Sequence, residues 1–594
     1  MIQRLYEGLR YLAYPVRRNL VFFVFMFLLF RITRWFENIS PDENGLYFLE
    51  LFFDLYVVCA VISLLPKRVR FWARIVIYIL SYLIVVVEAF IVERFHLFYS
   101  PVTLQLFMET NSNEAGEFLN AYLWSKALWR VTWVYGLILL FNVLIAFSLR
   151  PLITMLRKHF RGVSTTIMAF NVFVPLMMVY SLHATVNEKI KIWHFFMLKD
   201  TVQIERTDMR AFYSPFYRIL FSLKHLQVSA TELETLRKNM RSLKVDSCSH
   251  HTPNIVLVIG ESYNKHHSSV YGYGLPTTPW QCQLKANGSL VSFSDAITPW
   301  NVTSNAFKNF MSTHSTDQKG SWADGVLFPA LFRKAGYKVA FLSSQFYKSP
   351  NLGIVDFNGS FFMNDAELDT MCFDHRNPFR TKYDRVLVNK LSKYEPEKYN
   401  LVIFHGMGQH QEYKMRFPTD FAKFTKKDYA SRHDLNDEEK QIVADYDNAT
   451  LYNDEVLTRI CSFFRKWDVI VVYMPDHGEE VYDELHTFGR DHNANIVPEL
   501  ARNEFEIPFE IWFSKSFRRN HPDVVRAVRR AKDRPFSSDD LPHLLLGLAG
   551  IHCSYYNPER DLLSDKYNEH RKRLLKGRTD YDSLMKPYYQ KHPK

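Results

Sequence analysis

Two apolar segments, separated by about 200 residues, each end in side chains that bind metal ions. Residues 254–260 (Asn-Ile-Val-Leu-Val-Ile-Gly) are followed by Glu261, and residues 468–475 are followed by Asp476 and His477. Unbroken aliphatic runs are typical of buried parallel strands, and chemistry collects beyond the carboxyl ends of such strands. Either end alone also fits an ordinary strand-to-loop turn. Together, two carboxylates and an imidazole predict a metal site, and they suit zinc.

A hydroxyl nucleophile for this site is available in residues 297–312. There, Thr303 and Ser304 precede a pattern that could open a helix. As an N-cap, either residue would lie where helix N–H groups can also hold phosphate oxygens. A metal ion lowers the pKa of a coordinated hydroxyl and neutralises phosphoryl oxygens, so the combination suits phosphoryl transfer. The alternative is a capped helix without a catalytic role.

The residues from 251 onward show an α/β pattern. Helical or loop stretches separate the predicted strands, which are residues 254–260, 337–343, 400–406, 468–475 and 507–514. This alternation predicts a mostly parallel central sheet with helices on both faces. We expect a catalytic domain over residues 251–575 and a basic tail over 576–594. Five of the six cysteines lie after residue 185, and because five is an odd number and their spacing is wide, no disulfide framework is assigned.

The first third of the chain is predicted to cross a membrane. Its apolar runs reach or approach spanning length and are residues 20–35, 46–65, 75–91, 133–148 and 166–183. Any one of them could be a buried core helix, but their clustering favours a five-helix transmembrane bundle over residues 1–185. The first run is short and contains Arg31, whose side chain would reach toward the lipid surface.

The loops between these runs alternate between basic and base-poor segments. The basic segments are the N-terminal tail, the loop with Lys67 and Arg68, and the loop with Arg157 and Lys158. The positive-inside rule therefore places the N-terminus in the cytoplasm, and an odd number of spans exports everything after about residue 185. Residues 186–250 fit either interfacial helices or a helical linker. The net charge of +11 suits anionic lipid, and no nucleic-acid signature accompanies it.

Five short motifs in a fixed order resemble the bacterial phosphoethanolamine transferases, which are sulfatase-like members of the alkaline phosphatase superfamily. The motifs are residues 254–262, Thr303 to Ser312, His405-Gly-Met-Gly-Gln-His410, residues 446–454 and Pro475-Asp-His-Gly-Glu-Glu480. The resemblance covers nearly the whole chain. It implies five transmembrane helices in a bacterial inner membrane and a periplasmic sulfatase/alkaline-phosphatase-like domain. It further implies transfer of phosphoethanolamine from phosphatidylethanolamine to an envelope glycolipid such as lipid A or the lipopolysaccharide core.

The same resemblance implies roles for individual residues. Thr303 corresponds to the nucleophile that carries the phosphoryl group. Ser304 remains an alternative, because the residues around Thr303 depart from the family's motif. Zinc would be held by Thr303 together with Glu261, Asp476 and His477. The residues that match the family's substrate-binding positions are Lys348, His410 and His492, with His486 as the alternative to His492.

Other functions fit parts of this pattern. A lipoteichoic acid synthase-like enzyme, which transfers glycerophosphate, also has five spans, and a periplasmic glucan could replace the glycolipid as acceptor. A sulfatase is disfavoured because no Cys or Ser is followed by Pro at +2 and Arg at +4, the pattern needed to make formylglycine. An inactive membrane receptor is disfavoured because the metal-binding residue types are all present.

Overall fold

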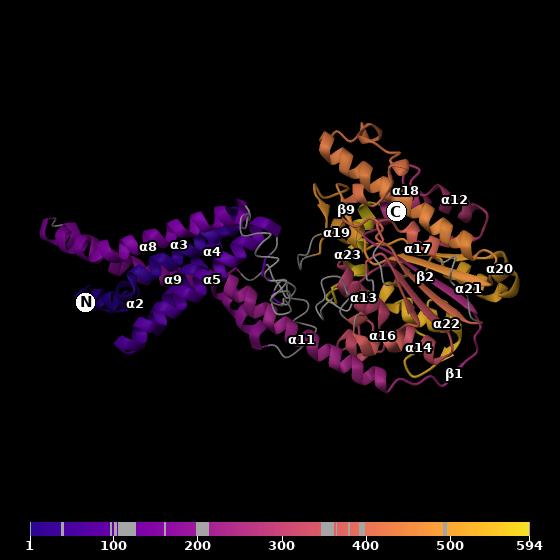
Figure 1. Ribbon diagram of the computed structural model, residues 1–594, viewed down its shortest axis with the longest axis horizontal. Coiled ribbons are helices and arrows are strands. Elements are labelled where there is room, and N and C mark those ends of the chain that lie inside the picture. The colour runs from indigo at the N-terminus through magenta and orange to yellow at the C-terminus, as the bar shows by residue number, and fades with distance from the viewer. Residues whose placement is uncertain are drawn as a thin grey trace. The chain divides into compact units, whose positions relative to one another are not determined.

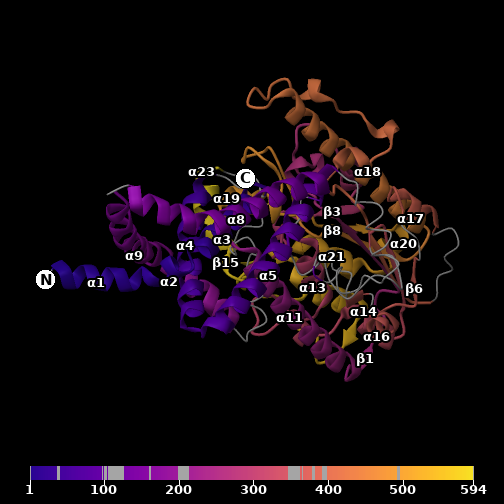
Figure 2. The ribbon, with the colours of Figure 1, turned by 60° about the vertical axis from the view of Figure 1, so that its left-hand side comes forward.

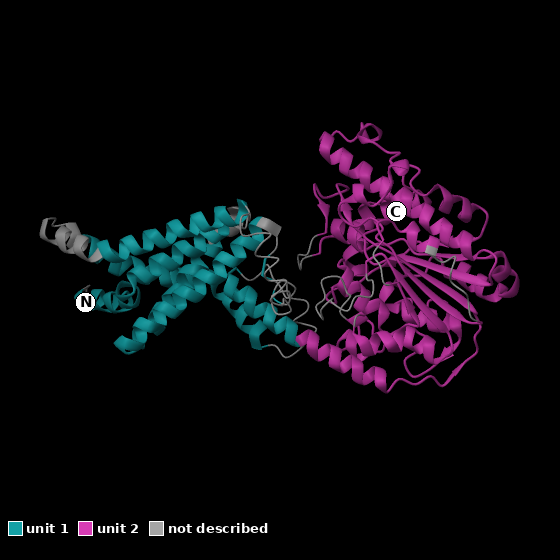
Figure 3. Ribbon diagram, in the orientation of Figure 1, with its two compact units in different colours: residues 1–227 teal, residues 228–594 magenta. Residues whose placement is uncertain are grey.

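The computed structural model describes residues 2–36, 41–95, 98–99, 104, 126–159, 162–197, 213–345, 362–363, 365–377, 381–390, 398–490 and 496–592. The chain forms two compact units, residues 1–227 and residues 228–594 (Figure 3). The first unit is helical in its described residues, and the second is an α/β domain.

The helices of the first unit pack through a core of aromatic and aliphatic side chains. In this core, Phe22 and Met26 of α3 belong to one buried cluster with Leu51 and Leu55 of α4. The helices are α1 (Ile2–Leu12), α2 (Tyr14–Arg18), α3 (Leu20–Phe36), α4 (Pro41–Leu64), α5 (Lys67–Phe95), α8 (Lys126–His159) and α9 (Gly162–Met197). Helix α11 (Pro215–Arg241) contains the boundary between the two units.

Four helices in the described part of the chain are long and apolar enough to cross a membrane. They are Leu46–Leu64, Lys67–Glu93, Lys126–Ser148 and Thr165–Met197, and they contain four of the five predicted runs. The remaining run lies in α3, whose 17 residues would rise only about 26 Å. The N-terminal apolar helices are therefore confirmed, whereas the predicted count of five spans is not.

A seven-stranded sheet forms the centre of the second unit. In spatial order its strands are β3 (Leu290–Ser292), β11 (Glu510–Phe513), β8 (Val469–Pro475), β2 (Asn254–Gly260), β7 (Asn400–His405), β5 (Lys338–Ser343) and β6 (His375–Arg376). Strands β8, β2, β7, β5 and β6 are parallel, and β11 is antiparallel to both of its neighbours. The expectation of a mostly parallel sheet is confirmed.

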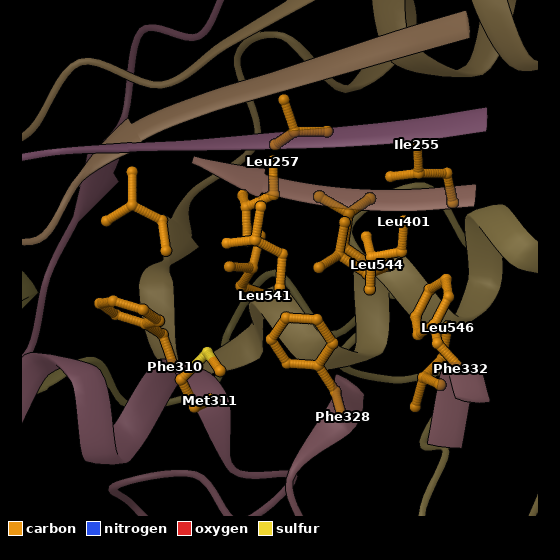
Figure 4. Close-up of a cluster of buried hydrophobic side chains, with 14 of the residues drawn as sticks. Ile255, Leu257, Phe310, Met311, Phe328, Phe332, Leu401, Leu541, Leu544 and Leu546 are labelled. Carbon is orange, nitrogen blue, oxygen red and sulfur yellow. The ribbon is translucent and has the colours of Figure 1, made fainter. Parts of the chain in front are cut away.

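Helices cover both faces of this sheet. Successive side chains of β2 point to opposite faces, and the apolar ones on each face pack against a helix. Ile255 and Leu257 belong to the core that includes Phe310 of α13 (Thr303–Met311) and Leu544 of α22 (Leu541–Ala549) (Figure 4). Val256 and Val258 instead share a cluster with residues of α18 (Asp437–Phe464), such as Val456. Figure 1 shows α18 on one side of the strands and α13 and α22 on the other, and Figure 2 also shows α18 and α13 on opposite sides. Each fully buried aliphatic side chain contributes about 1.5–3 kcal/mol, so this double layer fixes β2 firmly.

The remaining elements surround this core. The helices are α12 (Pro279–Ala286), α14 (Phe328–Lys334), α16 (Ala366–Cys372), α17 (Arg385–Lys390), α19 (Pro498–Glu504), α20 (Lys515–Asn520), α21 (Pro522–Ala531) and α23 (Tyr581–Lys591). Two-stranded ladders pair β1 (Ser247–Cys248) with β13 (Ile551–His552), β9 (Glu480–Val481) with β10 (Phe488–Gly489), β4 (Ala296–Ile297) with β12 (Phe536–Ser537), and β14 (Leu574–Leu575) with β15 (Thr579–Asp580). Part of the segment expected to be a basic tail is helix α23, which buries Tyr581 and Met585.

Candidate active site

The predicted metal ligands meet at the carboxyl ends of β2 and β8. Gly260 pairs with Pro475 in the parallel ladder, so the next residues, Glu261 and Asp476, leave the sheet side by side. Glu261, Asp476 and His477 are all fully buried, and each offers a ligand atom within 4.8 Å of the others. The structure therefore brings together three residues from segments more than 200 positions apart.

Hydrogen bonds hold the imidazole and the Asp476 carboxylate in a fixed orientation. Nδ1 of His477 lies 2.8 Å from the carbonyl oxygen of Gly478, so in the neutral ring it carries the proton and Nε2 keeps a lone pair that can bind a metal. Oδ1 of Asp476 accepts hydrogen bonds from the backbone N–H groups of Ser262 and His477 at 3.2 Å and 2.8 Å. Its other oxygen, Oδ2, is buried without a hydrogen-bond partner, 3.3 Å from Nε2 of His477. An unpartnered buried carboxylate oxygen beside a ligand nitrogen fits a bound cation.

The two buried carboxylates influence each other's ionisation. Burial raises the pKa of Asp476 well above its ordinary value, and the negative charge of Glu261 raises it further. Burial also disfavours the charged form of Glu261, but a protonated His477 ring, which can donate from Nε2 and carries positive charge, outweighs burial and lowers that pKa. A divalent cation between them would supply the positive charge that lets both carboxylates ionise.

Thr303 lies at the centre of this cluster. Its Oγ1 is 3.3 Å from both carboxylate oxygens of Glu261 and 3.2 Å from Nε2 of His477. By contrast, Oγ of Ser304 contacts Oδ1 of Asn305 at 3.4 Å. Of the two hydroxyl residues left open by the sequence, Thr303 is the one in contact with the metal-binding groups.

The predicted capping role of these hydroxyl groups is wrong. Val302 occupies the N-cap of α13 without a side-chain hydrogen bond, and Thr303 is the first residue of the helix. The Thr303 side chain contacts the metal-binding groups, so it does not bond back to the helix backbone. Helix α13 still begins at the site, because its first residue contacts Glu261 and His477.

The other predicted site residues have different outcomes. Lys348 and His492 lie outside the described residues. His410 follows β7 in a loop, where burial lowers its pKa and where it interacts electrostatically with Glu261. The side chain of His486 is 66% exposed and lies 3.4 Å from Oε1 of Glu439. His486 is therefore outside the described cluster.

Gln345 and Arg490 contact the cluster but were missed by sequence reasoning. Nε2 of Gln345 donates to Oε2 of Glu261 and to the carbonyl oxygen of Gly406, both at 2.9 Å. Nη1 of Arg490 donates to Nε2 of His477 at 2.9 Å. The sequence offers no sign of the role of Arg490, because a single arginine outside a recognisable motif has no characteristic spacing.

Comparisons with known proteins show the family to which this chain belongs. Residues 253–551, half of the chain, match the sulfatase family, and the chain belongs to this family. The chain is similar to the phosphoethanolamine transferase EptC of Escherichia coli strain K12, with 26% identity over 587 residues, 96% of this chain and 95% of EptC. It is also 26% identical over 580 residues to the phosphoethanolamine transferase CptA of Salmonella typhimurium, 92% of this chain and 91% of CptA.

A solved structure shows the same fold over most of the chain. The integral membrane protein lipooligosaccharide phosphoethanolamine transferase A from Neisseria meningitidis has a TM-score of 0.51 and 18% identity. The match covers 93% of this chain and 97% of that protein. The sulfatase family match and the two transferase relatives confirm the resemblance that the ordered motifs indicate.

Proposed function

We propose that this protein transfers phosphoethanolamine from phosphatidylethanolamine to an envelope glycolipid, either lipid A or the lipopolysaccharide core, through a covalent intermediate on Thr303. The observation that carries the proposal is the contact of Oγ1 of Thr303 with Glu261 and His477 inside a buried cluster of metal-binding groups. Two relatives named as phosphoethanolamine transferases, each aligned over more than 90% of this chain, support the choice of group transferred.

Zinc is the proposed metal, held by Glu261, Asp476, His477 and Thr303. Carboxylate oxygens and a neutral imidazole are zinc ligands, and the unprotonated Nε2 of His477 and Oδ2 of Asp476 fit this set. When bound, zinc lowers the pKa of a ligand hydroxyl and neutralises negative charge on a phosphoryl group.

The reaction would proceed in two displacements at phosphorus. Oγ1 of Thr303 attacks the phosphodiester, a bond from phosphorus to Oγ1 forms, and the bond to the diacylglycerol oxygen breaks. The threonine proton ends on the diacylglycerol, which leaves. The acceptor oxygen then attacks the same phosphorus, and Thr303 regains a proton from the acceptor. Glu261 and His477 hold Oγ1 in place, while His410, Lys348 and His492 are proposed to contact the phosphoryl oxygens.

The proposed location is a bacterial inner membrane, with five spans over residues 1–185, linker helices over residues 186–250 and the catalytic domain in the periplasm. Four described helices that could cross a membrane and the alternation of basic loops support this arrangement. A catalytic domain joined to membrane helices suits a donor and an acceptor that both reside in lipid.

The direct test uses the full-length protein in detergent with phosphatidylethanolamine labelled in its ethanolamine group. We expect release of diacylglycerol and transfer of the label to lipid A or core glycolipid, and loss of both after metal removal by a chelator. Phosphatidylglycerol as donor tests the lipoteichoic acid synthase-like alternative. A periplasmic glucan as acceptor tests the alternative in which a glucan replaces the glycolipid. Diacylglycerol release from phosphatidylglycerol alone would contradict the proposal.

A further inference from the structure

A short hairpin begins three residues after His477 and returns the chain to the same site at Arg490. Strands β9 and β10 pair antiparallel, with Gly489 opposite Glu480. Gly489 adopts a φ of +100°, a backbone conformation that favours glycine, and the next residue is Arg490. The hairpin therefore delivers a guanidinium group to the end of the sheet that carries His477.

Arg490 is held inside the site by a buried carboxylate. Its Nε lies 3.6 Å from Oε2 of Glu479, while Nη1 donates to Nε2 of His477 at 2.9 Å. Glu479 is fully buried and is itself fixed by Tyr413, whose hydroxyl donates to Oε1 at 2.7 Å. Only 15% of the Arg490 side chain is exposed, so the guanidinium belongs to the site and not to the solvated surface.

The geometry also relates Arg490 to the nucleophile. Oγ1 of Thr303 and Nη1 of Arg490 contact the same nitrogen of His477, at 3.2 Å and 2.9 Å, so they lie no more than about 6 Å apart. The oxygens of a phosphoryl group attached to Oγ1 extend beyond that atom, so a charge-assisted hydrogen bond of about 2.8 Å to the guanidinium fits within this limit. Arginine suits this contact because it stays protonated and presents a planar fork to two oxygens.

We propose that Arg490 binds the phosphoryl oxygens of the group carried by Thr303, and that it competes with the metal ion for Nε2 of His477. The second part follows from the tautomer: Nδ1 carries the ring proton, so Nε2 has one lone pair for either the guanidinium or a metal. A metal that takes the lone pair releases the guanidinium, which Glu479 keeps in the site. The first part rests on the proposed function, whereas the second does not.

This role predicts opposite changes in metal binding and in transfer. Arg490→Gln removes a competing donor and a positive charge near the metal, so zinc should bind about 3- to 10-fold more tightly. The same substitution removes a phosphoryl contact, so diacylglycerol release from phosphatidylethanolamine should slow by about 100-fold. A merely structural arginine would weaken both properties when removed.

The experiment uses full-length wild type, Arg490→Gln and Arg490→Ala in detergent. Zinc affinity is measured by competition with a chromophoric chelator, and inorganic phosphate binding to the zinc-loaded protein is measured by calorimetry. Arg502→Gln is the matched control, because Arg502 pairs with Glu484 at 2.9 Å outside the cluster. We expect wild-type behaviour from the control, weaker phosphate binding in both Arg490 variants, and partial rescue of Arg490→Ala by added guanidinium.

Each readout can overturn the inference separately. Weaker or unchanged zinc binding in Arg490→Gln contradicts the competition for Nε2. Unchanged phosphate affinity, or transfer at the wild-type rate, contradicts the phosphoryl contact. If the wild type does not act on phosphatidylethanolamine, the proposed function fails, yet the zinc and phosphate measurements still decide the role of Arg490.

Discussion

At the scale of single residues, a carboxyl group buried in the sheet makes stability depend on pH. Glu510 in β11 is fully buried, and burial raises its pKa to about 8. In the unfolded chain it ionises near its ordinary value of 4.5, so the folded protein retains a proton that the unfolded chain has lost. The contribution of Glu510 to stability therefore falls as pH rises from about 4.5 to 8.

Glu510→Gln should remove this pH dependence. At pH 8.5 the free energy of unfolding of the variant should exceed that of the wild type by about 1–3 kcal/mol. The neutral amide avoids placing a negative charge in the apolar interior. At pH 5 the two proteins should differ little. Thermal unfolding at both pH values checks this, with the exposed Glu559→Gln as control. A variant that is destabilised equally at both pH values would show that the carboxyl group has another role.

The metal site gives a second residue-scale prediction. Wild-type protein should contain one zinc ion per chain, and His477→Ala should lose it, because the ring supplies a ligand nitrogen that is fixed by Gly478. His486→Ala serves as the control, since its exposed ring pairs with Glu439. Elemental analysis of the purified proteins provides the measurement. Equal zinc content in the two variants would remove His477 from the ligand set.

At the scale of elements, the loop after β7 is constrained by its approach to the metal site. Gly408 has a φ of +43°, and a Cβ atom there would lie 2.7 Å from the carbonyl oxygen of Glu261 and 2.8 Å from its nitrogen. The backbone N–H of Gln409 donates to the same carbonyl oxygen at 3.0 Å. The glycine thus lets the segment His405–His410 pack directly against Glu261, a proposed metal ligand.

Gly408→Ala should displace Glu261 and reduce zinc affinity by about 10-fold or more, in the range seen when groups supporting a metal ligand are lost. Gly274→Ala is a suitable control because nothing lies within 4 Å of its Cβ position. Chelator competition measures the affinities, and circular dichroism establishes that both variants fold. Unchanged zinc affinity in folded Gly408→Ala would mean that the loop adjusts without moving Glu261.

The sequence revealed the strands that hold the chemistry better than the loops that complete it. All five predicted strands exist, because long aliphatic runs such as residues 254–260 have few alternatives in a soluble domain. Strands β3 and β6 have three and two residues and carry no periodic signal. The antiparallel direction of β11 also left no trace in its composition, since both kinds of buried strand are apolar.

The same limit applies to the site. Glu261, Asp476 and His477 were found because each follows a recognisable strand. Arg490 reaches His477 through a tight hairpin, and Gln345 lies just beyond β5, so their contacts depend on loop paths that residue spacing does not specify. Choosing between Thr303 and Ser304 required the structure, because the choice depends on which of the two side chains points from α13 toward Glu261 and His477.

At the scale of the whole molecule, the side of the membrane on which the catalytic domain lies depends on whether α3 crosses the membrane. Four spans would return the chain to the side of the N-terminus, whereas a fifth span through α3 would export residues 251–594. The basic loops favour the fifth span. A fluorescent protein fused after Lys594 that folds only in the cytoplasm should therefore be dark, and a periplasm-active phosphatase at the same position should be active. A bright fluorescent fusion would contradict the five-span arrangement.

The most direct test of the central claim is to identify the adduct that forms when the enzyme meets its donor without an acceptor. Full-length protein is incubated with phosphatidylethanolamine alone, digested and mapped by mass spectrometry. We expect phosphoethanolamine on Thr303, no adduct in zinc-containing Thr303→Ala, and a retained adduct in Ser304→Ala. An adduct on Ser304 would reassign the nucleophile. Normal transfer by Thr303→Ala with no adduct on any residue would contradict the covalent mechanism.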